Sequence, residues 1–93
     1  MVTQELAIVL KHDSFSFRDA CRVSDLAMKY RVARTIVVDL RAARDATTAA
    51  FAQLVLLRRA LLKTGRDLRL VNLKDRAAHL FGINRLAAVL PCG

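Results

Sequence analysis

Thr35–Gly65, TIVVDLRAARDATTAAFAQLVLLRRALLKTG, is the stretch that decides the fold of this chain. It opens with Thr35–Leu40, whose β-branched residues are typical of a central strand in a sheet that is covered on both faces. Arg41–Ala46 is polar and lacks an apolar period, so we expect a loop there. Apolar residues at helical spacing fill the remainder. The stretch therefore predicts a buried strand, a loop and a long helix, in that order.

The long helix has recognisable signals at both ends. Thr47 or Thr48 is the expected N-cap, because a threonine hydroxyl accepts a hydrogen bond from an amide of the first turn. Gly65 suits the left-handed position just past the last helical residue, which we place near Lys63. One apolar stripe on the helical wheel forms the expected core face. It consists of Ala50, Leu54, Leu57 and Leu61, with Phe51 and Arg58 beside it.

Three further apolar side chains of this helix lie off the stripe. Val55, Leu56 and Leu62 fall beside Arg59 and Lys63 on the wheel. They either pack against a neighbouring helix or form a partly apolar surface for a partner.

Strands and helices alternate on both sides of the central stretch. Gln4–Lys11 is a short apolar run with β-branched residues, which suits a buried strand. Apolar residues recur at helical spacing over Phe17–Arg31, with Ser16 as the expected N-cap and Asp19 as its capping-box partner. Asp67–Leu73 alternates in polarity, which predicts another strand with one face more exposed to solvent than the other.

Two short helical segments are expected after the last strand. The first covers Asp75–Phe81 and would stop at Gly82, and the second covers Asn84–Val89 before Pro91. Alternating strands and helices favour right-handed crossovers. We therefore predict that residues 1–93 form one small α/β domain, with a mostly parallel or mixed sheet of about four strands and helices packed on it.

The chain is strongly basic, with a net charge of +8. Arg58–Arg76 alone holds seven Lys or Arg against two Asp, a net +5. Such a surface favours nucleic acid, anionic lipid or other acidic partners, or it serves solubility alone. The basic strand lacks aromatic residues that would stack on bases, so nucleic acid is the less favoured partner.

The N-terminal region does not have the pattern of a signal peptide, because Glu5 and Lys11 interrupt its apolar part. No apolar run approaches the roughly 18–20 residues that cross a bilayer. Cys21 and Cys92 do not form a disulfide framework. We therefore expect a cytoplasmic protein without a membrane span.

The sequence offers little for catalysis. Walker A, GxGxxG, GxSxG and HExxH motifs are absent, and His12 and His79 lack the spacing of metal ligands. We expect no catalytic residue, no metal and no cofactor. Asp39 ends the central strand, where α/β sheets place functional groups, but it can equally cap the following loop through bonds to the backbone.

The helix start at Thr47–Phe51 is the best candidate site. The free amides and the positive dipole end of a helix N-terminus favour an anion. A hydroxyl there could carry a phosphate, whose charge the same position would stabilise. An ordinary N-cap would also use at least one threonine, so the residues alone leave both roles open.

The spacing of these residues resembles the STAS domain, the fold of anti-sigma factor antagonists. In that family a strand ending in Asp-Leu precedes an Asp-Ser-Ser-Gly or Asp-Thr-Ala-Gly motif by eight residues, and a Gly follows eighteen residues after the motif Asp. Here Asp39 lies eight residues before Thr47, and Gly65 lies eighteen residues after it. Leu68–Asn72 and Leu80–Leu86 are also similar to the family, so the resemblance covers nearly the whole chain.

The resemblance assigns each motif position to a residue of this chain. Thr47 stands at the family's Asp, Thr48 at the first Ser or Thr, Ala49 at the serine that partner kinases usually phosphorylate, and Ala50 at the Gly. Asp45 would give another register, but it breaks both spacings. Thr48 is therefore the phosphoacceptor that the resemblance leaves. Thr48–Ala50 is also similar to the Asp-Thr-Ala-Gly motif in the STAS subunit of phospholipid-trafficking ABC transporters.

The resemblance implies a non-enzymatic regulator of transcription that binds an anti-sigma kinase or, alternatively, an accessory subunit that binds the ATPase of such a transporter. Only one N-terminal strand is evident where the family has a pair, which leaves an edge that a second copy or a partner would cover. The residues expected to bind the partner are Asp39, Arg41, Arg44, Asp45, Thr47, Thr48, Ala49, Ala50, Val55 and Arg59.

Overall fold

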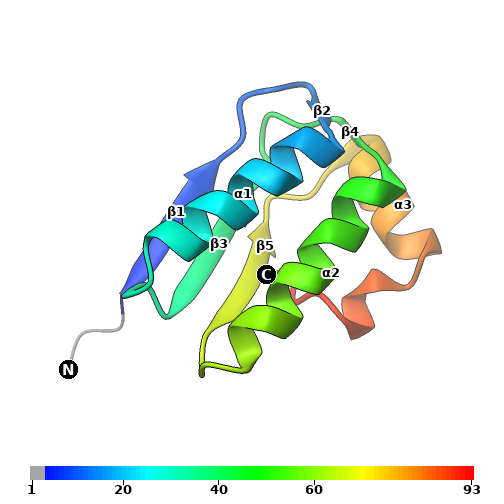
Figure 1. Ribbon diagram of the computed structural model, residues 1–93. Coiled ribbons are helices and arrows are strands. Elements are labelled where there is room, and N and C mark those ends of the chain that lie inside the picture. Colours follow the sequence, from blue (N-terminus) through cyan, green and yellow to red (C-terminus); the bar gives the residue numbers. More distant parts are fainter. Residues whose placement is uncertain (1–3) are drawn as a thin grey trace.

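The chain folds around two small parallel sheets, and the computed structural model describes residues 4–93 (Figure 1). The main sheet has the order β1-β3-β5, formed by Glu5–Val9, Thr35–Asp39 and Asp67–Val71. The second sheet pairs the two-residue strands β2 (Ser14–Phe15) and β4 (Asp45–Ala46). The predicted α/β fold is confirmed, and the three long strands lie within the predicted ranges.

Both long helices lie on one face of the main sheet (Figure 1). α1 (Phe17–Lys29) and α2 (Thr48–Leu62) pack against each other, and α3 (Asp75–Ile83) and the 3-10 helix η1 (Leu86–Ala88) follow β5. The two crossovers move along the sheet in the same direction, so right-handed connections place both helices on the same face. None of the helices in the described part of the chain is long and apolar enough to cross a membrane.

The opposite face of the main sheet is not covered in the way that the sequence predicted for the central strand. Val37 on this face is only 8% exposed, but its neighbours in the same row, Ala7 and Arg69, are both exposed. The side chain of Arg69 reaches across β3 toward Glu5, with 3.7 Å between Nη2 and Oε2. Side chains of the outer strands therefore shield Val37 where the sequence predicted a packed layer.

The core lies between the main sheet and the two long helices. α2 buries the whole predicted stripe, together with Phe51 beside it. The buried residues are Ala50, Phe51, Leu54, Leu57 and Leu61. Phe15 of β2 packs edge-to-face on Phe51, with ring centroids 5.8 Å apart, and Phe51 packs in the same way on Phe81 of α3 at 5.7 Å. These rings join the small sheet, α2 and α3 into one packed unit.

The ends of the long helices follow the predicted signals. Ser16 and Asp19 form the capping box at the start of α1, each side chain accepting from the other residue's amide. Gly65 has φ of 75°, and its amide donates to the carbonyl of Leu62 at 3.2 Å. The amide of Arg66 donates to Leu61 at 3.0 Å, which completes a Schellman motif after α2.

The predicted end of α3 at Gly82 is wrong. The helix continues through Gly82 to Ile83. The residue that takes the left-handed conformation is Arg85, with φ of 52°, and its amide donates to the carbonyl of Gly82 at 3.0 Å. A glycine permits a helix end but does not impose one, because it also adopts helical dihedral angles.

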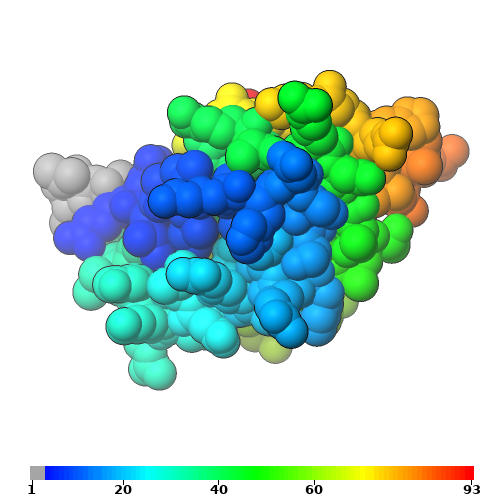
Figure 2. Space-filling model, turned by 90° about the horizontal axis from the view of Figure 1, so that it is seen from above, coloured from blue at the N-terminus to red at the C-terminus, as the bar shows by residue number. Residues whose placement is uncertain are grey.

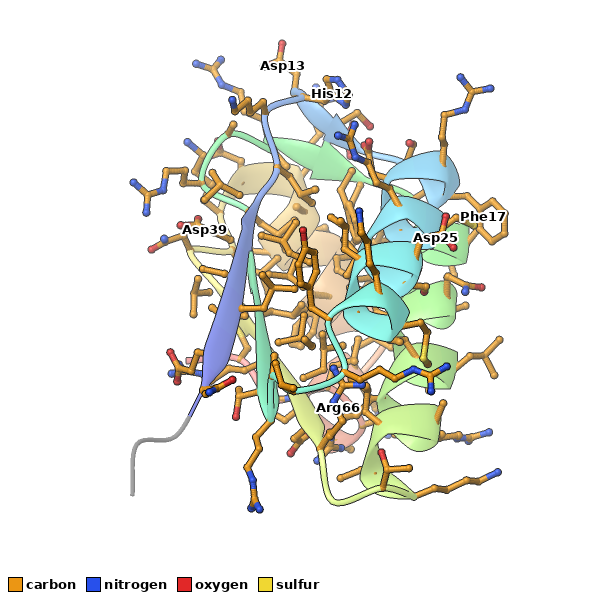
Figure 3. All side chains as sticks on the ribbon, turned by 60° about the vertical axis from the view of Figure 1, so that its left-hand side comes forward. His12, Asp13, Phe17, Asp25, Asp39 and Arg66 are labelled. Atoms are coloured by element: carbon orange, nitrogen blue, oxygen red, sulfur yellow. The ribbon has the colours of Figure 1, made fainter. Side chains whose placement is uncertain are left out.

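Arg66 is a buried cation that the sequence did not reveal. Only 9% of the residue is exposed. Its Nε donates to the carbonyl of Ala33 at 2.7 Å, and its Nη2 donates to those of Ala27 and Tyr30 at 2.9 and 3.0 Å. Figure 3 shows Arg66 at the end of the fold opposite His12 and Asp13. The guanidinium group therefore satisfies the carbonyls at the negative end of α1.

Candidate partner-binding site

The candidate site lies at the end of the molecule where β3 ends and α2 begins. Figure 2 looks down on this end, where the green segment of residues 41–50 lies between the blue segment of 11–18 and the yellow-to-orange start of α3. Three parts of the chain that are distant in sequence thus build one surface.

The two threonines at the start of α2 have different roles. Thr47 has extended backbone angles, and its Oγ1 accepts from the amide of Ala50 at 3.1 Å, so Thr47 is the N-cap. Thr48 is the first helical residue and is exposed. The side chain of Thr48 therefore faces solvent at the positive end of the helix dipole, where added negative charge is favoured.

The segment before α2 is more ordered than the predicted loop. Asp45 and Ala46 form β4, and the amide of Thr47 donates to the carbonyl of Phe15 in β2 at 3.1 Å. On the other side, the carbonyl of Arg44 accepts from Ala77 of α3 at 3.1 Å. The prediction of a loop over 41–46 is thus wrong for its last two residues. A two-residue strand has no detectable period, and its pairing partner is about 30 residues away.

Asp39 anchors the start of this segment. It is 5% exposed, and its Oδ1 accepts from the amide of Arg41 at 3.0 Å and from Nδ2 of Asn72 at 2.9 Å. Its Oδ2 accepts from Nε of Arg41 at 2.9 Å. The hydrogen bond from Arg41 is the main reason why the pKa of Asp39 falls to about 2. An ionised carboxylate with these donors positions the loop and is not suited to accept a proton near neutral pH, so the loop-capping role is the one the structure supports.

The two alanines of the motif lie on different sides of α2. Ala49 is exposed, so its methyl group stands on the surface where the resemblance would place a phosphorylated serine. Ala50 is fully buried in the core. The expectation that Ala50 contacts a partner therefore does not hold for its side chain, because the stripe that includes Ala50 faces the sheet.

Charged side chains surround the helix start. The side chain of Arg41 is 67% exposed even though its guanidinium group is hydrogen-bonded to Asp39, and Arg44 is exposed. Oδ2 of Asp45 lies 3.7 Å from Nη1 of Arg76. The rim therefore carries more positive than negative side chains, which suits a partner surface with acidic groups.

A shallow groove of about 120 Å³ extends the site along the outer side of α2. Val55 is half-buried, while Leu62 is 48% exposed and Val89, after η1, is 38% exposed. Leu56 on the same helix is 57% exposed. The sequence left two alternatives for Val55, Leu56 and Leu62, namely burial in the protein or a partly apolar surface. Val55 is partly buried, whereas Leu56 and Leu62 form an apolar surface. The groove is lined by Val55, Arg58, Arg59, Leu62, Ala88 and Val89.

Several contacts at this end were not predicted from sequence. Asn72, which bonds Asp39, has φ of 60°, and asparagine is one of the residue types that enter this region, so its position after a strand was a usable signal. His12 Nδ1 lies 3.0 Å from Oδ1 of Asp19, and Arg76 lies beside Asp45. No local pattern indicates these two pairs, because each joins segments brought together only by the fold.

The fold is similar to that of TM1081, a protein whose structure was solved by NMR. The TM-score is 0.80 with 9% sequence identity, and the likeness covers 100% of this chain and 76% of that chain. Such a low identity shows the fold alone, and the fold agrees with the predicted α/β architecture. No family model matches the sequence, and no curated protein matches it.

Proposed function

We propose that this protein is a non-enzymatic regulatory module of the STAS type, similar to anti-sigma factor antagonists, that acts in the cytoplasm. It binds a protein partner, such as an anti-sigma kinase, through the start of α2 at Thr47–Phe51. The observation that carries the proposal is the helix start itself, where Thr47 supplies the cap while Thr48 and Ala49 stay exposed. The spacing from Asp39 through Thr47 to Gly65 supports it.

The rigidity of the site is a further support. The backbone before α2 is held at two places. Asp39 is hydrogen-bonded to Arg41 and Asn72, and β4 is paired with β2. A pre-formed surface loses little conformational entropy when a partner binds. The exposed apolar groups along α2 would form the centre of the contact, and the arginines would form its rim.

Thr48 is the residue through which this binding would be regulated. A phosphate on its exposed hydroxyl would be stabilised by the helix dipole. The same phosphate would add bulk and negative charge to the contact surface at the start of α2, so we expect it to weaken partner binding.

A binding assay with a purified anti-sigma kinase from the same genome tests the proposal. Thr48→Glu and Arg59→Glu should each weaken binding at least about tenfold, which corresponds to roughly 1.4 kcal/mol. Arg34→Glu is the matched control, because Arg34 is exposed but lies just before β3, at the opposite end of that strand from the site. Loss of binding in Arg34→Glu, with the two site variants unaffected, would count against the proposal.

Incubation of the chain with that kinase and ATP, followed by mass spectrometry, tests the regulation. We expect one phosphate, on Thr48, and none in Thr48→Ala. A phosphate on another residue would refute the role of Thr48 while leaving the binding surface in place.

The alternative function is that of an accessory subunit bound to the ATPase of a phospholipid-trafficking ABC transporter. One observation favours it: the exposed residue at the usual phosphoserine position is Ala49, which suits a contact that is not switched. Co-purification separates the two functions. A stable complex with an ATPase that persists in Thr48→Ala supports the transporter role, and a kinase in its place supports the regulatory role.

Nucleic acid is the less supported partner. Four arginines of the basic segment 58–76 are already engaged within the molecule: Arg58 with Asp67, Arg66 with backbone carbonyls, Arg69 with Glu5 and Arg76 with Asp45. Phosphate-backbone binding requires cations that are free to replace counterions and produces a steep dependence on salt. We therefore expect at most weak binding to duplex DNA.

A further inference from the structure

The outer edge of β1 is a surface that the proposed function does not use. β1 stands at the end of the order β1-β3-β5, so within residues 4–93 it has a neighbouring strand on one side only. Figure 3 shows β1 at the front of the sheet with α1 beside it. Natural proteins usually block such edges with proline, bulges or charges. Here the register of Glu5–Val9 on β3 is continuous, and the edge is apolar between Glu5 and Lys11.

The hydrogen bonds to β3 show which backbone groups of this edge are free. The amide of Leu10 donates to Asp39 at 3.0 Å, and the carbonyl of Gln4 accepts from Arg34 at 2.9 Å. The amide and carbonyl of one residue point to the same side of a strand, and the side alternates along the chain. The even-numbered residues therefore face β3, and Glu5, Ala7 and Val9 present their amides and carbonyls at the free edge.

These positions restrict how a second copy of β1 could pair with the first. In an antiparallel pair, residues that face the free edge on both strands must lie opposite each other. A pair centred on Ile8 satisfies this condition, because it places Ala7 opposite Val9 of the second copy. The same register places Glu5 opposite Lys11, and by symmetry this contact occurs twice.

Several antiparallel registers place the free backbone groups of the two copies opposite each other. The charged side chains distinguish the register centred on Ile8 from the other registers. Moving the centre to Ala7 places Glu5 opposite Val9. Moving it to Val9 places Glu5 opposite position 13, which lies in the bend after β1, where the carbonyl of Asp13 accepts from the amides of Arg44 and Asp45, so Glu5 would have no extended partner there. Centring on Ile8 is the choice that sets opposite charges at both ends of the paired segment.

The side chains also leave room for a second strand. A groove of about 440 Å³ lies between β1 and α1, and its apolar walls include Leu6, Ile8 and Leu26. A two-fold axis perpendicular to the sheet keeps these side chains on the same face in both copies. Ile8 would then lie opposite Ile8 in a non-hydrogen-bonded pair, where side chains approach most closely. On the other face, the pair would cover Val9, which is 48% exposed.

We propose that two copies of this protein associate through β1, antiparallel and centred on Ile8, so that their three-stranded sheets form one continuous sheet. The start of α2 remains accessible, because β1 and α2 lie on opposite sides of the fold (Figure 1). Dimerisation is therefore independent of the proposed partner binding.

Sedimentation of the full chain over a range of concentrations tests the register through the charges. The wild-type protein should shift from monomer to dimer as concentration rises. Lys11→Glu and Glu5→Lys should each raise the dissociation constant about tenfold, because each change acts at two symmetric contacts. The double variant, Glu5→Lys with Lys11→Glu, should restore the wild-type value. If the double variant is as weak as the single ones, the register is refuted.

A proline substitution tests the edge itself. Ala7→Pro removes an amide that points away from β3, so the monomer should keep its far-UV circular dichroism while dimerisation is lost. Glu5 lies near Arg69 in the monomer, so its replacement could also change the stability of the monomer. The melting temperature of every variant is therefore measured together with its sedimentation. A wild-type protein that stays monomeric at all concentrations, or a dimer that persists in Ala7→Pro, overturns the proposal.

Discussion

The side-chain amide of Asn72 donates to Oδ1 of Asp39 at 2.9 Å and joins the carboxyl end of β5 to that of β3. Arg41 binds the same carboxylate from the next turn of the chain. One buried aspartate thus determines how the chain leaves the central strand and where the segment toward α2 begins.

Replacing this aspartate should destabilise the protein. Asp39→Asn keeps the size of the side chain but removes the charge that Arg41 and Asn72 bind. We expect a loss of about 2 kcal/mol in the free energy of unfolding, measured by urea denaturation. Asp25→Asn, at an exposed position of α1, should change it by less than about 0.5 kcal/mol. Equal effects of the two changes would contradict the anchoring role of Asp39.

The stability of the protein should fall in acid through the same carboxylate. The pKa of Asp39 is about 2 in the folded protein, below its ordinary value of 3.8, chiefly because Arg41 donates to it. A lowered folded-state pKa stabilises the protein above the unfolded-state pKa, and this contribution is lost as the pH falls. The melting temperature should therefore drop between about pH 4 and about pH 2, and the drop should be smaller in Asp39→Asn. Parallel curves for the two proteins would exclude this explanation.

Two glycines should respond oppositely to alanine. Gly65 has φ of 75°, which an alanine adopts only with strain, so Gly65→Ala should destabilise by about 1 kcal/mol. Gly82 lies within α3, and a Cβ there would meet nothing within 4 Å, so Gly82→Ala should stabilise by about 0.5–1 kcal/mol. Thermal unfolding of both variants checks the signs. A stabilised Gly65→Ala would refute the Schellman end of α2.

Replacing each of the two threonines at the start of α2 should change the stability of the protein by different amounts. Thr47→Ala removes the cap on the amide of Ala50 and should cost about 1 kcal/mol. Thr48→Ala should be nearly neutral, because the exposed Thr48 is not the cap. Thr47→Ser keeps a hydroxyl in place and should retain most of the stability. Chemical denaturation of the three variants compares them directly, and a larger loss in Thr48→Ala would reverse the assignment.

Among the basic residues, Arg66 should be the one whose replacement lowers the free energy of unfolding most. Arg66→Met would remove the guanidinium donor from the carbonyls of Ala27, Tyr30 and Ala33, although Tyr30 would keep the amide of Ala33, and we expect a loss of about 3 kcal/mol. Arg66→Lys should recover part of this loss, because an ammonium cannot reproduce the fork of the guanidinium. Arg34→Met, at an exposed arginine, is the control, and an equal loss there would show that the carbonyl contacts of Arg66 are not the cause.

The predictions from sequence were accurate where the signal lies in nearby residues. The β-branched run at Thr35–Leu40, the stripe from Ala50 to Leu61 and the glycine after α2 all specify local geometry, and each agrees with the structure. The predictions failed where the outcome depends on a remote segment. The strand at Asp45–Ala46 exists only because Ser14–Phe15 lies beside it.

The candidate site divides in the same way. Its location at the start of α2 and the presence of a threonine cap followed from residue types alone. The choice of Thr47 over Thr48 as the cap required the tertiary structure, because either hydroxyl could reach an amide of the first turn. The burial of Ala50 agrees with its place in the predicted apolar stripe and contradicts only its assignment to the partner contacts.

Hydrophobic periods and cap residues were sufficient to predict the α/β order of the chain, because they act within a few positions of each other. The burial of Arg66, the hydrogen bond from Asn72 to Asp39 and the placement of both long helices on one face of the sheet became visible only in the folded structure. Each of these facts depends on parts of the chain that meet only after the crossovers close. No local pattern encodes such a meeting, because it results from the packing of the whole domain.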